Sequence, residues 1–207
     1  MPGFDDDEYE SFDLDRAGET TSTATVPQVA PDHDDEDEDD EDDDLEDATD
    51  EEIDFVIATY REDGQLYVQP LTVDLANDLE ELIVQLRRLP GDAGAIGFVS
   101  LVEEICIIVR VRGPHVQVLL SDGGAATDWP IARDVADYLN EEITDDEDDT
   151  EPMGDLGILA DLGMSAFEMG AIMDNLDLSS DQMLIEVAEK VKINPAFRVA
   201  AEAAFGS

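Results

Sequence analysis

The chain has 207 residues with 56 acidic and 10 basic side chains, which gives a formal net charge of −46. This charge argues against direct nucleic-acid binding, which depends on Lys and Arg neutralising phosphates, and disfavours docking on anionic membranes, so basic proteins or cations are the expected partners. One cysteine precludes an intrachain disulfide, and the sequence shows neither a signal peptide nor an apolar run of membrane-span length, so we expect a soluble cytoplasmic protein.

The negative charge is concentrated at the N-terminus. Residues 1–52 hold 25 acidic side chains and one basic side chain. Like charges repel one another and little apolar surface is present to bury, so we predict a disordered acidic tail over 1–52. Four apolar side chains spaced among the acids could dock on a basic, apolar groove; alternatively the tail is solubilising and makes no specific contact. These side chains are Phe4, Tyr9, Phe12 and Leu14.

Two runs of strand-type residues, at 53–60 and 66–71, begin the folded part. They flank a Glu-Asp-Gly-Gln sequence that predicts a hairpin turn, with glycine where a positive φ is needed. Leucine and isoleucine then recur at helical spacing over 75–89. Thr72 or Asp74 is the expected N-cap of this helix, and a Pro-Gly pair ends it.

Three apolar, β-branched runs follow, at 95–102, 104–111 and 116–121, and predict three antiparallel strands. Pro130 occupies the first turn of a second helix. The order over 53–140 is therefore β-β-α-β-β-β-α, an α+β fold in which two helices cover an antiparallel sheet of about five strands. Longin- and roadblock-type scaffolds have an analogous order and pair through sheet or helix edges, so a homodimer is one assembly to test for.

The C-terminal part has helical periodicity throughout. An acidic linker at 141–152 separates it from the α+β domain, and we predict a small all-helical region over 153–207. Ser-x-x-Glu starting at residue 165 and Ser-x-x-Gln starting at residue 179 have the capping-box pattern, and Gly163 is placed as a helix stop. The predicted helices cover 155–162, about 165–173, about 179–193 and 196–205.

The sequence offers no arrangement typical of catalysis or metal binding. Cys106 lies among Ile and Val in a predicted strand, as an inert core residue does. His33 and His115 are not at ligand spacing, and no phosphate-binding glycine loop or EF-hand pattern is present. We therefore expect a protein that is not an enzyme and has no cofactor and no metal site.

Three features are candidate protein-interaction surfaces. In the first, Arg110 and Arg112 project from the same face of one strand because they are two residues apart, and with Arg61 they could form a basic patch. The alternative is that they pair across the strands with local acids such as Glu103 or Glu104.

The second and third candidates are more apolar. The loop 121–129 contains Asp122 and Asp128 and ends at the only tryptophan, Trp129, which is either an anchor for a partner or a lid on the core. The helix at 165–173 has no Lys or Arg, so it is not suited to reading a nucleic-acid groove. Its methionines suit either an exposed, adaptable interface or helix packing. They are Met164, Met169 and Met173.

Six short segments in combination match the pattern of one known family. With x for any residue, they are DFVIAxYREDG at 54–64, LRRLPG at 86–91, VRVRG at 109–113, LLSD at 119–122, DWPIARD at 128–134 and GDLxxLADLG at 154–163. Over about residues 53–193 the chain thus resembles the bacterial tRNA adenosine deaminase-associated proteins.

The resemblance implies association with the deaminase that converts adenosine to inosine at the tRNA wobble position, and it implies no activity or catalytic residues. The chain lacks the His-x-Glu and Pro-Cys-x-x-Cys zinc signature of the deaminases themselves. We expect a non-catalytic accessory or adaptor protein that contacts the deaminase or its basic RNA-binding surface. The alternative is an acidic mimic of nucleic acid, whose tail occupies basic RNA- or DNA-binding surfaces.

Overall fold

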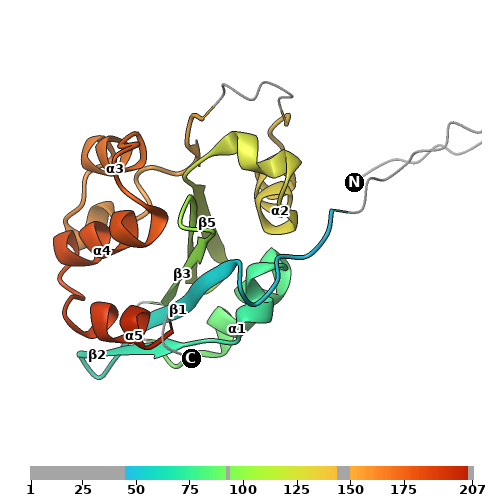
Figure 1. Cartoon of the computed structure of the whole chain (residues 1–207). Helices are drawn as coiled ribbons and strands as arrows, with labels where there is room; N and C mark the ends of the chain where they lie inside the picture. The colour runs from blue at the N-terminus through green and yellow to red at the C-terminus, as the bar shows by residue number, and fades with distance from the viewer. Residues whose placement is uncertain (1–44, 92–93, 144–149, 205–207) are drawn as a thin grey trace, which may run out of the picture. The chain divides into compact units, whose positions relative to one another are not determined.

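The computed structural model describes residues 45–91, 94–143 and 150–204 (Figure 1). Residues 1–44 of the expected acidic tail and residues 144–149 of the expected linker lie outside the described residues. The described chain makes tertiary contacts before Ile53: Ala48 is buried, and its backbone N–H and C=O both hydrogen-bond to the side-chain amide of Asn77, at 2.8 and 2.9 Å.

The centre of the fold is a six-stranded antiparallel sheet with the strand order β2-β1-β3-β4-β5-β6. Five of its strands match the predicted ones closely. The sixth, β6, has only two residues and pairs with β5, and such a short strand has no periodicity to detect. The strands are β1 (Ile53–Glu62), β2 (Gln65–Pro70), β3 (Ala95–Leu101), β4 (Ile105–Arg112), β5 (His115–Leu120) and β6 (Met153–Gly154).

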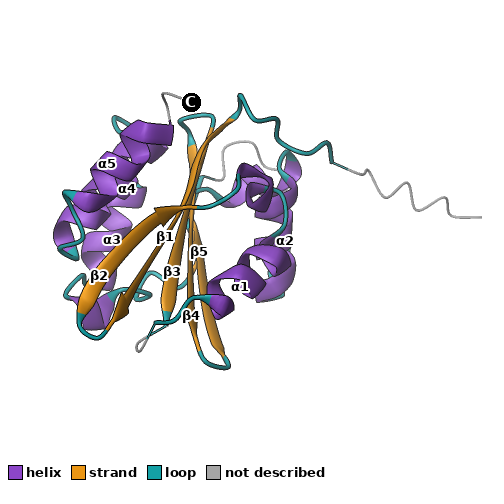
Figure 2. Cartoon of the chain, turned by 90° about the horizontal axis from the view of Figure 1, so that it is seen from below, coloured by secondary structure: helices purple, strands orange, loops and turns teal. Residues whose placement is uncertain are grey.

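Helices cover both faces of this sheet, as Figure 2 shows with the strands seen between two helical layers. One layer consists of α1 (Leu79–Arg88) and α2 (Pro130–Leu139). The other consists of α3 (Ala166–Met173), α4 (Ser180–Lys190) and α5 (Ala196–Ala204). Every residue of β3 is buried because both layers cover this central strand, and its sequence is accordingly apolar almost without interruption. The predicted α+β class, with a helical C-terminal region, is confirmed.

The first core lies between the sheet and the α1–α2 layer. Leu82 and Leu86 of α1 and Val135 of α2 pack against strand residues such as Val99 and Val109. The α1 helix does not begin where the sequence predicted. Residues Val73–Ala76 form a separate 3-10 helix, η1. The α1 helix begins only after the next acidic residue along the chain.

The N-cap of α1 is Asp78, and the prediction of Thr72 or Asp74 is wrong. The Asp78 carboxylate accepts a hydrogen bond from the Glu81 N–H at 2.8 Å. A second carboxylate, that of Asp134 on α2, accepts the Leu79 N–H at 3.0 Å. Both bonds satisfy backbone donors that would otherwise have no partner in the first turn of the helix.

The second core lies between the sheet and the α3–α5 layer. Phe197 of α5 is fully buried and makes edge-to-face contacts with two strand residues, Phe55 and Phe98, with ring centroids 5.9 and 5.0 Å apart. The same core contains the buried side chains of α4, including Leu184 and Val187. The aromatic cluster thus joins the last helix to the middle of the sheet.

The capping patterns in this layer have different outcomes. The Ser165–Glu168 capping box is present, with each side chain bonded to the backbone N–H of the other. At Ser179 the predicted box is wrong, because the hydroxyl donates to Asp181 and makes no capping bond to the backbone. The predicted helix at 155–162 is reduced to a 3-10 turn, η3 (Ala160–Leu162), which Gly163 ends with φ +97°.

Cys106 is fully buried in β4, and burial raises the pKa of its thiol to about 12. The reactive thiolate is therefore scarce at neutral pH, and the sulfur is inaccessible. We expect the native protein to resist a thiol reagent such as DTNB in mildly alkaline buffer, and to react fully once it is unfolded in urea. Rapid labelling of the native protein would contradict the burial of Cys106.

Candidate functional site

The three arginines of the predicted basic patch converge at one end of the sheet. β1 pairs Thr59 with Ile96 of β3, and β3 pairs Ile96 with Arg110 of β4, so these side chains lie in one row on the face covered by α3–α5. Arg61 and Arg112 are the next residues on the same face of β1 and β4. Their convergence depends on the intervening strand β3.

Arg110 is a buried cation, with 3% of its side chain exposed. Its guanidinium forms a two-pronged ion pair with Asp161, and Nη1 also donates to the Ile158 carbonyl at 2.7 Å. The hydrogen bonds from Arg110, opposed by partial desolvation, hold the pKa of Asp161 below its usual range. The expected alternative of pairing with Glu103 or Glu104 is wrong, because those residues belong to the turn at the opposite end of β4.

Arg112 and Arg61 are more exposed. Arg112 donates to the Gln117 side chain at 2.9 Å and has a nitrogen 3.6 Å from Asp161. Arg61 has no hydrogen bond or ion pair with any residue that the structure describes. Asp161 is thus the carboxylate shared by Arg110 and Arg112, and the cluster of these four side chains keeps a net positive charge on a strongly acidic protein.

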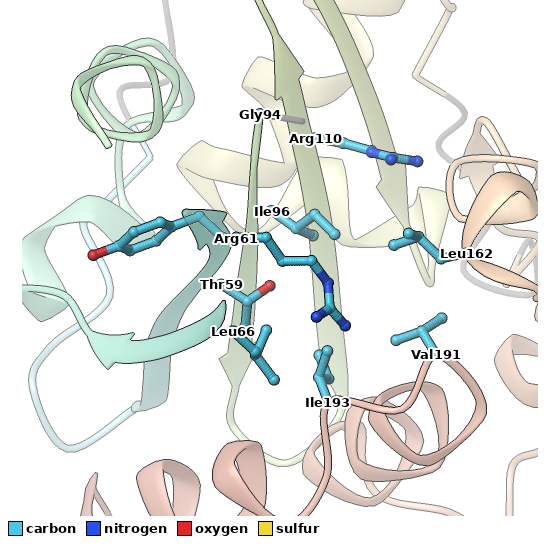
Figure 3. A pocket seen from close by; sticks show the side chains of 10 residues that line it. Thr59, Arg61, Leu66, Gly94, Ile96, Arg110, Leu162, Val191 and Ile193 are labelled. Carbon is cyan, nitrogen blue, oxygen red and sulfur yellow. The ribbon is translucent and has the colours of Figure 1, made fainter. Parts of the chain in front are cut away.

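A small cavity of about 40 Å³ opens between these arginines and the α3–α5 layer (Figure 3). Figure 3 shows Arg61 reaching from β1 toward Ile193, and Arg110 pointing toward Leu162. The walls are otherwise mostly apolar. The lining residues are Thr59, Tyr60, Arg61, Leu66, Gly94, Ile96, Arg110, Leu162, Val191 and Ile193.

The loop 121–129 is a structured turn over the first core. Asp122 caps the 3-10 helix η2 (Gly123–Thr127) by accepting the Gly124 N–H at 2.9 Å, and Asp128 is exposed at its end. Trp129 is half-buried against the first core and precedes α2, so it packs as a lid.

The three methionines are buried in the second core, where Met164 and Met169 are 0% exposed and Met173 is 3% exposed. The prediction that they form an exposed interface is wrong, and the packing alternative describes them. Met173 contacts the Cys106 sulfur, with the two sulfur atoms 3.7 Å apart. Met169 and Met173 are four residues apart on α3, and Met164 precedes the helix. Their positions in the sequence could not tell whether they meet solvent or the sheet.

A surface that the sequence did not single out is the groove between α1 and α2, with a volume of about 750 Å³. Four carboxylates line it, and one basic side chain, Arg87, stands against them. Tyr138 contributes an aromatic ring that is 49% exposed. The signal in the sequence that could have indicated this groove was the acidic outer face of each of the two amphipathic helices. The carboxylates belong to Asp78, Glu80, Asp134 and Asp137.

Asp134 has the most perturbed environment in this groove. Partial burial raises its pKa, and the nearby charges of Asp78, Asp137 and Glu80 add to the rise, while the hydrogen bond from Leu79 opposes it. The groove is therefore a concentrated negative field on two rigid helices. A cationic group placed there would favour the ionised form of Asp134.

A second groove, of about 700 Å³, is apolar and lies between the edge strand β2 and α5. Its walls are valine, proline and alanine side chains, and Val199 is 65% exposed.

In the described part of the chain, no group of His, Cys, Asp or Glu side chains is arranged to hold a metal ion. Within the same residues, each helix is too short or too polar to cross a membrane.

The fold that positions these surfaces matches a known family. The model of the Rv3753c-like tRNA adenosine deaminase-associated proteins matches residues 54–194, from the second residue of β1 to the connection between α4 and α5. The chain belongs to this family. The match includes both helical layers as far as α4, and thus the arginine cluster and the acidic groove.

A member of the family, Protein Rv3753c of Mycobacterium tuberculosis, is 33% identical to this chain over 147 residues. That alignment covers 70% of this chain and 85% of the relative. The predicted resemblance to the tRNA adenosine deaminase-associated proteins is thereby confirmed. No solved structure matches the chain.

Proposed function

We propose that this protein is a non-catalytic accessory protein that binds a tRNA adenosine deaminase. The observation that carries this proposal is the family match over 54–194, because the family is described by its association with that enzyme. The described surface offers contact area in the form of two grooves. The cavity beside Arg110 is only about 40 Å³ and could not hold a nucleoside.

The acidic groove between α1 and α2 is the face that we assign to the deaminase. A protein that binds tRNA needs Lys and Arg to neutralise phosphates, so its surface is basic where RNA docks. The four carboxylates of the groove complement such a surface, and they would speed encounter and fix orientation. Tyr138, half exposed beside them, supplies an aromatic anchor of the kind that carries binding energy.

We expect salt-sensitive binding that depends on this groove. In calorimetric titrations of the deaminase at low and at physiological ionic strength, the double variant Asp134→Asn, Asp137→Asn should bind about tenfold more weakly than the unmodified chain. The new amide of Asp134→Asn would still offer an oxygen to the Leu79 N–H, so the fold should persist. The matched control, Glu186→Gln with Glu202→Gln, removes two carboxylates from the other helical layer and should bind normally.

Three results would contradict the proposal. The first is no binding of the deaminase at either salt concentration, and the second is equal weakening in the test and control variants. The third comes from removing residues 1–44: an adaptor should retain its affinity, whereas an acidic mimic of nucleic acid that binds through its tail should lose it. Measuring tRNA adenosine-to-inosine conversion with and without the protein would then show whether the enzyme is activated, inhibited or tethered.

A further inference from the structure

We propose that the cavity beside the arginine cluster is a binding site for a carboxylate carried on a small apolar group. This site lies on the opposite side of the sheet from the acidic groove, and the proposal does not depend on the deaminase. It follows from three observations on the described residues: an arginine without a partner there, a hydroxyl that no other described side chain or backbone group engages, and a cavity of defined size with apolar walls.

The first observation is the state of Arg61. Its guanidinium has no hydrogen-bond or ion-pair partner among the described residues. Figure 3 shows it directed into the space between the sheet and Ile193. An arginine presents a planar fork of donors that matches the two oxygens of a carboxylate. Arg110, paired with Asp161, adds a second positive group to the wall.

The second observation is the hydroxyl of Thr59, on the same face of β1 as Arg61. Thr59 is 2% exposed, and no other residue in the described chain hydrogen-bonds to its side chain. Its oxygen lies beside the Arg61 side chain in Figure 3. Among the described residues, Asn194 Oδ1 is the one fully enclosed side-chain polar atom without a partner, so the Thr59 oxygen keeps access to the cavity that it lines. An anion held by Arg61 in this cavity could accept a hydrogen bond from the Thr59 hydroxyl.

The third observation is the size and character of the cavity. Its volume is about 40 Å³, roughly three times the 10–15 Å³ that one water molecule requires. This leaves room for about three heavy atoms, which suits the carboxylate group alone and is too small for a phosphate group. The group that carries the carboxylate would therefore lie at the open mouth of the cavity. Leu66, Leu162, Val191 and Ile193 form apolar walls that strengthen an ion pair by excluding water and that would contact an aliphatic group.

The charge balance of the site favours an anion in spite of the acidity of the whole protein. Asp161 is the one carboxylate among the described residues that contacts the arginines, and it is already engaged by Arg110 and Arg112. The three arginines and Asp161 together carry two net positive charges, and Arg61 and Arg110 are the two arginines that line the cavity. Such a carboxylate could come from an aliphatic acid or from the C-terminus of a peptide, which share this chemistry.

The test is a titration of the ¹⁵N-labelled full-length protein, followed by NMR at constant ionic strength. Isobutyrate represents an aliphatic acid, N-acetylvaline represents a peptide C-terminus, and N-acetylvalinamide is the neutral control. We expect saturable shifts of the Ile96 and Ile193 amide signals with one or both acids and none with the amide. The acid that binds more tightly identifies the source of the carboxylate.

Two variants test the residues. Arg61→Gln should weaken binding about tenfold or more, because it removes a charge-assisted pair. Thr59→Val keeps the shape and the strand preference of the side chain, and should weaken binding about tenfold or more through loss of one hydrogen bond to the charged carboxylate. Arg88→Gln removes one exposed arginine from α1, in the other helical layer, and should change nothing.

Several results would overturn the assignment. Shifts that do not saturate, or that are the same with N-acetylvalinamide, would show that no carboxylate site exists. Binding of inorganic phosphate as tight as that of the carboxylates would contradict the size argument. Equal loss of binding in Arg61→Gln and Arg88→Gln would show that the effect is one of overall charge, provided that both variants keep the thermal stability of the unmodified chain.

Discussion

Replacing Phe197 by alanine should lower the free energy of unfolding by about 3–5 kcal/mol, the range for truncating a fully buried aromatic side chain. Phe197 is 0% exposed and packs edge-to-face on both Phe55 and Phe98, and each such contact contributes about 0.5–1.5 kcal/mol beyond the area that it buries. Neighbouring side chains on two strands and on α4 restrict collapse of the site. The cavity left by the ring would therefore persist.

The measurement is urea unfolding followed by circular dichroism at physiological ionic strength. Phe167→Ala is the matched control, because Phe167 is 86% exposed on α3 and its removal should change stability by less than about 0.5 kcal/mol. A melting temperature about 10 °C lower for Phe197→Ala would be consistent with a domain of this size. Equal stability of the two variants would mean that α5 is not docked on the sheet.

Replacing Asp161 by asparagine should cost about 2 kcal/mol of stability, less than the roughly 3–5 kcal/mol typical of removing one partner of a fully buried ion pair. The smaller figure applies because the Asp161 side chain is 53% exposed, so water can reach the guanidinium of Arg110 on one side. The asparagine could still accept one of the hydrogen bonds, but the positive charge would have lost its counter-ion.

The same pair predicts how stability depends on pH. The pKa of Asp161 is below its ordinary value in the folded protein, so in the acidic range around that ordinary value the unfolded chain binds more protons at this residue than the folded chain does. The contribution of the pair is therefore complete above the ordinary pKa. This stabilising contribution should be lost as the pH falls through the lowered pKa of Asp161 in the folded protein. Urea unfolding of the unmodified protein and of Asp161→Asn should converge under acidic conditions.

Two further variants make this prediction specific. Asp177→Asn removes an exposed carboxylate from the turn between α3 and α4 and should leave stability nearly unchanged. Adding Arg110→Met to Asp161→Asn should recover stability, because an apolar side chain of similar length replaces a buried charge without a partner. If the double variant is less stable than Asp161→Asn alone, Arg110 stabilises the fold through its packing and its bond to Ile158.

Most of the secondary structure could be predicted from local sequence, and the errors have a common cause. The strands agree with prediction because their burial follows the apolar pattern of the sequence. β1 and β4 are buried along most of their length, and both consist mainly of apolar residues. The N-cap of α1 was misplaced because Thr72, Asp74 and Asp78 have equivalent capping chemistry. The choice depended on Asp134, which is 55 residues away in sequence from the Leu79 N–H that it accepts.

Part of the candidate site could likewise be predicted from local sequence, and part could not. The proximity of Arg110 to Arg112 follows from their spacing, because residues two apart on a strand share a face. The identity of their partner could not be predicted, because Asp161 is 51 residues from Arg110 and belongs to a short 3-10 turn. The acidic groove likewise required the side-by-side packing of α1 and α2, whose sequences are separated by the three central strands.

The sequence by itself determined the charge of this protein, its family, the five main strands and most of the helices, because composition and periodicity are properties of contiguous residues. Only the tertiary structure decided that the methionines are buried, that Arg110 is paired with Asp161 while Arg61 has no partner among the described residues, and that two acidic helix faces meet in a groove. The physical reason is that periodicity records which side of an element is apolar. The element that covers that side is chosen by packing between distant segments, which no local pattern encodes.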